Sequence, residues 1–167
     1  MTYKEYTSTL KRQITNLSYQ RRLEFALTVC DKLYPEYEKF VNKYHWGDKT
    51  LLRDAFITCQ RATKEQVNKS QIEKLLPEID SIVPDMDDFG SDYLGSYALN
   101  ASAAVYETLQ FLIDRNSDHI FNIATYYSDT IDFKVQEDTD LTEEEIEKHP
   151  LMTEAWNFII QETKNGV

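Results

Sequence analysis

The chain has 167 residues, 41% of them hydrophobic, and a formal net charge of −11 at pH 7. A surplus of acidic side chains repels the phosphate backbone of nucleic acids, so we expect no nucleic-acid partner. No apolar run approaches the length of a membrane-spanning helix and no leader peptide is evident, so we expect a cytoplasmic protein with no membrane partner.

Apolar residues recur every three or four positions along the chain, a pattern typical of amphipathic helices. Alternation with a period of two, which indicates half-buried strands, is missing. We therefore predict an all-α fold: residues 1–167 form a single-domain bundle of about seven to nine helices.

The first predicted helix covers residues 2–15, and Ser18 has the position of a cap for the second. Pro35 should break or kink the second helix, because proline lacks an amide hydrogen and its ring clashes with the preceding turn. A new helix is expected to restart at this proline. Gly47 is predicted to cap its end, and Asp48 to cap the start of the next helix.

Residues 70–83 form the next predicted helix, with Pro77 suggesting a kink or a boundary near its middle. Two longer helices without breakers should follow at residues 91–115 and 117–136. Pro150 is expected to open the last helix, since proline is favoured at the first helical position.

The predicted helix at 91–115 contains many small side chains: Gly95, Ala98, Ala101, Ser102, Ala103 and Ala104. Small residues let neighbouring helices approach closely, so we predict that this is the central helix of the bundle. The alternative is a small-residue groove that binds a ligand or a peptide.

The aspartates that precede this helix do not match a calcium-binding loop. An EF-hand loop counted from the first of them, at position 85, would carry Phe89 and Ser96 where two ligands are required. A phosphate cradle is excluded because the stretch has four carboxylates and no lysine. We predict instead that Ser91 or Asp92 caps the helix, and that Gly90 takes an unusual backbone angle.

Five segments carry a resemblance to a known family: "VCDKLYPEYEKF", "WGD", "PDMDDFGSDYLGSYALNASAAV", "YYSDTIDFKV" and "HPLMTEAWNF". Together they resemble the YjaG-like bacterial family, which is domain of unknown function family 416. The resemblance runs from about Arg22 to Ile160, and "DFGSDY" and "HPLM" are its most specific parts. It implies a compact, all-helical, cytoplasmic bacterial domain, and it supplies no activity and no catalytic residues.

The residue types that bind metals are scattered along the chain. His45, His119 and His149 are far apart in sequence, so we predict no metal site and no cofactor. His119 falls in the first turn of a predicted helix, where a positive charge is unfavourable, and we expect a neutral polar cap residue. Cys30 and Cys59 both fall on apolar helical stripes and are predicted to be buried, reduced thiols.

Asp129 and Asp132 are candidates for catalysis because residues three apart lie next to each other on a helix. Two neighbouring carboxylates can divide acid and base work when their surroundings separate their pKa values. Asp92 and Tyr97 are further candidates, and no motif of a catalytic nucleophile is present. The competing interpretation is that the two aspartates face water.

Charge is distributed unevenly along the sequence. Residues 1–77 contain 14 Lys and Arg against 9 Asp and Glu, whereas residues 78–167 contain 4 against 20. The net charges of the two parts are therefore +5 and −16. The acidic connector 137–147, in which Thr142 and Glu145 have the spacing of a capping box, is expected to steer a basic partner through five side chains: Asp138, Asp140, Glu143, Glu144 and Glu145.

The leading functional hypothesis is a protein-binding or homo-oligomeric interaction module with an acidic surface. Its partner would be a basic protein or a second copy of the chain in a homodimer, and immunity against a toxin is one form of this hypothesis. The alternative is a small-molecule enzyme that uses Asp129 and Asp132 in a helical cleft. It is equally open whether the acidic half is neutralised within the fold by four basic residues: Lys11, Arg12, Arg21 and Arg22.

Overall fold

Helices are the regular elements of the computed structural model, which describes residues 1–137 and 139–164. Within these residues there are nine helices and no strand: α1 (Tyr3–Asn16), α2 (Tyr19–Tyr44), α3 (Lys49–Arg61), α4 (Lys69–Asp80), α5 (Met86–Phe89), α6 (Tyr93–Asp114), α7 (Ser117–Gln136), α8 (Glu143–Lys148) and α9 (Pro150–Glu162). The predicted all-α bundle is confirmed.

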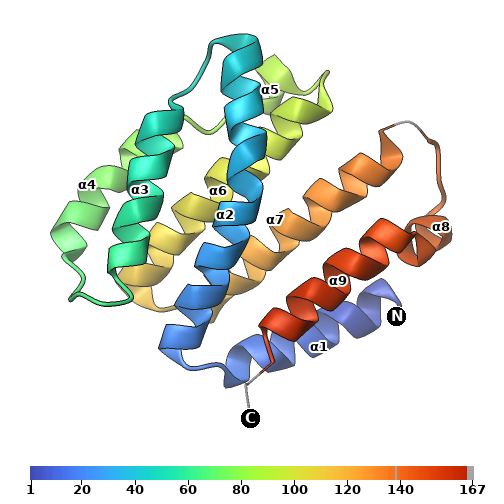
Figure 1. Ribbon diagram of the computed structural model, residues 1–167, viewed down its shortest axis with the longest axis horizontal. Helices are drawn as coiled ribbons and strands as arrows, with labels where there is room; N and C mark the ends of the chain where they lie inside the picture. The colour runs from blue at the N-terminus through green and yellow to red at the C-terminus, as the bar shows by residue number, and fades with distance from the viewer. Residues whose placement is uncertain (138, 165–167) are drawn as a thin grey trace.

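The bundle is built around α6, which contacts α2, α3, α4, α5 and α7. Figure 1 shows α3 and α4 at one edge of the molecule and α1, α8 and α9 at the opposite edge. Between α6 and that second edge lies α7, which also contacts α1, α8 and α9. Helices α1 and α9, from the two ends of the chain, therefore pack against each other on the outer side of α7.

Small side chains on α6 allow its neighbours to approach. Ala98, Ala101 and Ala104 are buried, and the buried hydroxyl of Ser102 donates to the carbonyl oxygen of Ala98 at 2.8 Å. The buried amide of Asn100 donates to the hydroxyl of Thr130 on α7 at 3.0 Å, so the polar groups at this contact are satisfied. The prediction that this small-residue helix is central to the fold is confirmed.

The start of α6 is fixed by the short helix α5. A Cβ atom on Gly95 would lie 2.5 Å from the carbonyl oxygen of Phe89, so only glycine permits this approach. Asp92 caps α6 as predicted, and Asp85 caps α5, a helix that the sequence analysis did not predict. The expected unusual angle at Gly90 is wrong: its φ of −72° and ψ of −6° are ordinary helical values.

The helix boundaries expected at the two prolines are absent, because neither residue ends or divides its helix. Pro35 lies inside α2 and Pro77 inside α4. A proline inside a helix costs about 3 kcal/mol. Leu33 and Tyr37, on either side of Pro35, are buried in the core, and this packing holds α2 together as one helix.

The turn between α2 and α3 differs from the prediction by two residues. His45, rather than Gly47, is the C-cap of α2, with a φ of 51° in the left-handed region. Gly47 follows with a φ of 88°, and Asp48 caps α3 as predicted. A Cβ on Gly47 would lie 2.5 Å from the hydroxyl of Tyr37, so glycine is required here for both angle and space.

Cys30 and Cys59 are buried and unpaired, as predicted. Burial raises the pKa of the Cys30 thiol to about 12, so this group is inert as a nucleophile at neutral pH. In the described part of the chain, no helix combines the length and apolarity that crossing a membrane requires.

Replacing Ala101 by Leu should lower the free energy of unfolding by about 1 to 3 kcal/mol, because the extra atoms must be forced between α6 and its neighbours. Urea denaturation followed by circular dichroism measures this change. The matched control is A103L on the same helix, where the side chain is only half-buried and the expected loss is smaller. An A101L variant that unfolds at the wild-type midpoint would contradict the packing described for α6.

Candidate functional site

Elements from the two ends of the chain enclose a cleft of about 350 Å³. Its walls come from the start of α1, the second half of α7, the short helix α8 and the first half of α9. These elements lie together at one edge of the bundle, beside the N-terminus (Figure 1). Asp129 and Asp132, two of the candidate residues, line this cleft.

Four carboxylates line the cleft in two pairs. Asp129 and Asp132 are three apart on α7, whereas Glu143 and Glu147 are four apart on α8, so each pair shares one face of its helix. No Lys, Arg or His lines the cleft. Within residues 1–137 and 139–164, none of the four carboxylates forms an ion pair.

The carboxylates differ in how far the fold satisfies them. Glu147 accepts the backbone N–H of Tyr3 at 2.9 Å, and Asp132 accepts the side-chain amide of Gln136 at 2.7 Å. Asp129 is half-buried and has no hydrogen-bond or ion-pair partner among the described residues. Burial raises the pKa of Asp129 above its ordinary value, and the charge of Asp132 raises it further. The cleft therefore contains a half-buried carboxylate with no protein partner among the described residues.

An aromatic wall stands beside the carboxylates. The ring of Tyr6 stacks on Trp156 with centroids 5.0 Å apart, and its hydroxyl is 3.0 Å from the hydroxyl of Ser128 on α7. Tyr3 is the third ring of this wall, and the centroids of the Tyr3 and Trp156 rings are 6.3 Å apart. Trp156 is only 3% exposed, and its indole N–H has no acceptor among the described residues.

Asp92 lies outside the cleft and has a structural role. Its carboxylate accepts the backbone N–H of Leu94 at 2.9 Å, the ammonium of Lys43 at 2.5 Å and the hydroxyl of Tyr44 at 2.5 Å. These three donors, with Lys43 first, lower the pKa of Asp92 to about 2. The residue ties the start of α6 to the end of α2, and both of its carboxylate oxygens already accept hydrogen bonds within the fold.

Tyr97 also lies outside the cleft. It is 4% exposed, its hydroxyl donates to Glu137 at 3.3 Å, and its ring lies 5.3 Å from the ammonium of Lys134. Burial is the main cause that raises the pKa of Tyr97 above its ordinary value. Lys134 in turn pairs with the buried Glu36, so this group of residues joins α2, α6 and α7. Of the four candidates, the structure brings only Asp129 and Asp132 together.

Sequence reasoning missed the other half of the cleft. Glu143 was expected to act only as a surface charge, and Glu147 and Trp156 were not singled out for function. The capping box of Thr142 and Glu145, which is present as predicted, indicates that α8 forms. It does not indicate that α8 packs onto α7, because that contact depends on the path of residues 137–142.

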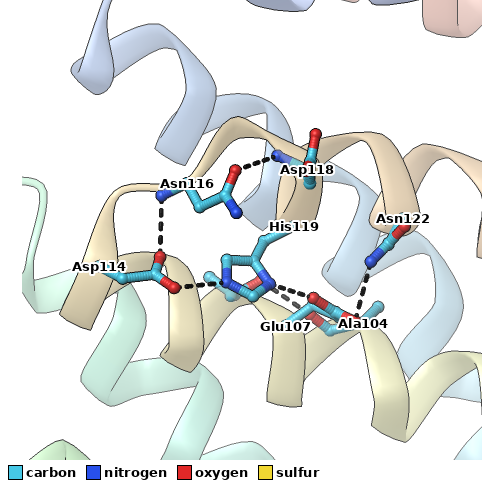
Figure 2. A network of polar contacts seen from close by, with 8 residues as sticks. Ala104, Glu107, Asp114, Asn116, Asp118, His119 and Asn122 are labelled. Carbon is cyan, nitrogen blue, oxygen red and sulfur yellow. Dashed lines mark hydrogen bonds and ion pairs between the residues drawn. The ribbon is translucent and has the colours of Figure 1, made fainter.

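A second polar cluster surrounds His119 and joins the end of α6 to the start of α7. Figure 2 shows the ring between Glu107 and Asp114, with Asn122 on the far side of Glu107. The Nδ1 atom of His119 contacts the Glu107 carboxylate, and Nε2 is 3.0 Å from the carboxylate of Asp114. Asn122 donates to the second oxygen of Glu107 at 3.2 Å, so the cluster satisfies itself.

The expectation that His119 is a cap residue is wrong, because Asn116 caps α7, and the two acids beside the ring favour its charged form. Burial by itself lowers the pKa of the imidazole, but hydrogen bonds to Asp114 and Glu107 and their charges outweigh it and raise the pKa above its ordinary value. The charge that the helix N-terminus disfavours is stabilised by carboxylates from the preceding helix.

In the part of the chain that the structure describes, no three His, Cys, Asp or Glu side chains are arranged to hold a metal ion. The absence of a metal and of a cofactor stays a prediction.

Comparisons with known proteins place the chain in a family and a fold. The family model described as "Protein of unknown function (DUF416)" matches residues 9–164. The curated proteins called "Uncharacterized protein YjaG" from Salmonella typhimurium and from Escherichia coli strain K12 are each 20% identical over 150 residues, which is 87% of this chain and 76% of each relative.

A solved structure has the same fold. The crystal structure of a DUF416 family protein from Shewanella baltica OS155 matches with a TM-score of 0.78 and 21% identity. The match covers 93% of this chain and 86% of that chain. At this identity the likeness concerns the arrangement of the helices.

Replacing His119 by Gln should remove a stabilising contribution that depends on pH. A histidine whose pKa is raised in the folded state contributes fully below its unfolded pKa of about 6.5, and the contribution is lost as pH rises through the folded pKa. We expect H119Q to be less stable than the wild type by about 1 to 3 kcal/mol near pH 6, with a smaller difference near pH 9. Urea denaturation at the two pH values measures both differences.

The control is H45N, which removes an exposed histidine outside the network and keeps a residue tolerated in the left-handed region. It is measured at the same two pH values for comparison with H119Q. A loss of stability in H119Q that did not change with pH would show that the imidazole is not charged in this network.

Proposed function

The chain belongs to the family of proteins of unknown function DUF416, whose family model spans nearly its full length, and from this premise we propose that it is a cytoplasmic protein-binding module. Its acidic cleft, with the neighbouring surface of α8, binds a basic protein. The observation that carries the proposal is the cleft itself, whose described lining includes four carboxylates and no basic side chain. The two unpaired cysteines fit a reducing compartment.

Two of the four basic residues considered for internal neutralisation contact other parts of the chain. Arg21 pairs with Glu24 at 2.9 Å, and Arg22 donates to the backbone oxygens of Ile14 and Thr15 at the end of α1. In residues 1–137 and 139–164, no ion pair joins Lys11, Arg12, Arg21 or Arg22 to an acidic residue of the second half. These four residues therefore do not neutralise the acidic half through ion pairs in the described chain, where Lys43 with Asp92 is a pair that joins a base of the first half to an acid of the second.

The acidic side chains of α8 extend the negative electrostatic potential of the cleft onto the neighbouring surface. Glu143, Glu144 and Glu145 occupy the first turn of this exposed helix, and only Glu144 is paired, with Lys148 at 2.5 Å. Asp140 precedes them, while Asp138 lies outside the described residues. A surface of one charge sign accelerates the encounter with an oppositely charged partner and disfavours partners of its own sign. These acids act mainly on the association rate.

A second function is favoured by one observation: the raised pKa of Asp129 beside Asp132 in a cleft. Such a pair could hold one proton and serve a small-molecule enzyme as acid and base. A substrate turned over by the wild type and not by D129N, with no stable protein partner, would favour this alternative over the binding module.

The binding module predicts an association rate that depends on salt and on the acids of α8. Once a basic partner is purified, its on-rate for the immobilised chain should fall by roughly tenfold or more between low and physiological ionic strength. E143Q/E144Q should slow association further at low salt. Surface plasmon resonance over a salt series measures these rates.

The matched control is E73Q/E78Q, which removes two exposed charges from α4 at the opposite edge of the bundle. It should leave the on-rate close to that of the wild type. An on-rate independent of salt, or an equal effect of the two double variants, would contradict the proposal. A second copy of the chain as the partner would appear as a concentration-dependent dimer that E143Q/E144Q weakens.

A further inference from the structure

We propose that the cleft binds the primary ammonium group of one lysine side chain, which the basic partner inserts between the carboxylates of α7 and α8 and the aromatic wall of Tyr3 and Trp156. This inference rests on the proposed function and names the group that anchors the partner. It joins three properties of the cleft: unpaired negative charge, apolar walls and, in the lining residue Trp156, a buried donor without an acceptor among the described residues.

The charge of the cleft requires a cation. Asp129 has no hydrogen-bond or ion-pair partner among the described residues, although it is half-buried and adjacent to a second carboxylate. Fixed charges of one sign in a partly desolvated cleft repel each other, and an added cation relieves this repulsion. Asp132 and Glu147 each have one oxygen engaged within the fold, which leaves their second oxygens for such a cation.

The arrangement of acceptors favours ammonium over guanidinium. Two of the carboxylates come from α7 and two from α8, so acceptors reach the cleft from two different helices. An ammonium is a compact charge whose three donors point in different directions. A guanidinium has its donors in one plane and matches a single carboxylate held flat against it. Lysine therefore fits this cleft better than arginine.

The walls suit the side chain that carries the ammonium. Ile146, Met152, Tyr3 and Trp156 line the cleft next to the carboxylates. They offer apolar surface to the four-carbon stem of a lysine, and the two rings can also attract its charge. A hydrated metal ion gains nothing from apolar walls. An alkylammonium has an apolar part that can contact these walls and a charged part that can contact the carboxylates.

The indole N–H of Trp156 indicates that the lysine belongs to a polypeptide. Trp156 lines the cleft, and its buried indole N–H has no acceptor among the described residues. The cleft is thus bordered by a donor without an acceptor and by Asp129, a half-buried carboxylate without a protein partner in the described chain. A lysine residue supplies both complements, an ammonium donor and peptide carbonyl acceptors, whereas a free alkylamine supplies only the donor.

The test uses the full chain labelled with nitrogen-15 and three small probes that differ at one group. The probes are Nα-acetyl-lysine-N-methylamide, the same molecule with its side-chain nitrogen acetylated, and the corresponding arginine derivative. We expect the lysine probe to shift the indole resonance of Trp156 and the amide resonances of Asp129 and Glu147. The acetylated probe should leave them unchanged, and the arginine probe should bind more weakly.

Two variants with equal loss of charge locate the site. D129N/D132N should weaken binding of the lysine probe by about tenfold or more, because it removes the charges that contact the ammonium. E73Q/D80N, which removes two exposed charges from α4, should bind the probe like the wild type. 1-Aminopentane, a free alkylamine with a single ammonium group, should bind more weakly than the lysine probe.

Several results would overturn the inference: no shift with the lysine probe, equal shifts with the acetylated probe, equal losses in both double variants, or tighter binding of the arginine probe or the free amine. If the lysine probe fails while a basic partner still associates in a salt-dependent manner, the inference is wrong and the proposed function stands. If the probe binds as expected and no basic protein partner exists, the ligand assignment stands and the proposed function is wrong.

Discussion

Close packing against the small side chains of α6 is the constraint on which the rest of the structure depends. Because Ala98, Ala101 and Ala104 take little space, α2 and α7 can lie directly against this helix. One side of α7 is then committed to the core, and its other side must be covered by α1, α8 and α9. The cleft forms where this outer cover is incomplete, between the acids of α7 and those of α8.

Some polar groups on α6 and α7 have charged partners within the fold and others have none, and this difference identifies the cleft. At the ends of α6, Asp92 has three donors and His119 lies between two carboxylates, so their charges stabilise the contacts between helices. Asp129 has no such partner, and its raised pKa means that the folded state holds a proton more tightly than the unfolded chain. Its ionisation therefore costs stability as pH rises above the ordinary value for aspartate, and a cationic ligand would remove that cost.

The sequence predicted local structure better than contacts between distant segments. The period of the apolar residues predicts the long helices, and the caps Ser18, Asp48 and Asp92 lie where expected, because both depend on neighbours within one turn. The helix boundaries expected at Pro35 and Pro77 are absent, since packing on both sides of a proline can exceed the local cost. The spacing of Asp129 and Asp132 indicated a shared face. Nothing local indicated that Trp156, from the last helix, would form the wall beside them.

The titration of Asp129 is the sharpest test of the proposal that this half-buried carboxylate, which has no protein partner among the described residues, is kept for a cationic ligand. The carboxyl carbon of Asp129 can be followed by carbon-13 NMR as pH is changed, with and without Nα-acetyl-lysine-N-methylamide. The account predicts a pKa above the ordinary value for aspartate in the free protein and a lower pKa with the probe bound, because an ammonium favours the charged carboxylate. An ordinary pKa in the free protein that the probe leaves unchanged would contradict the account.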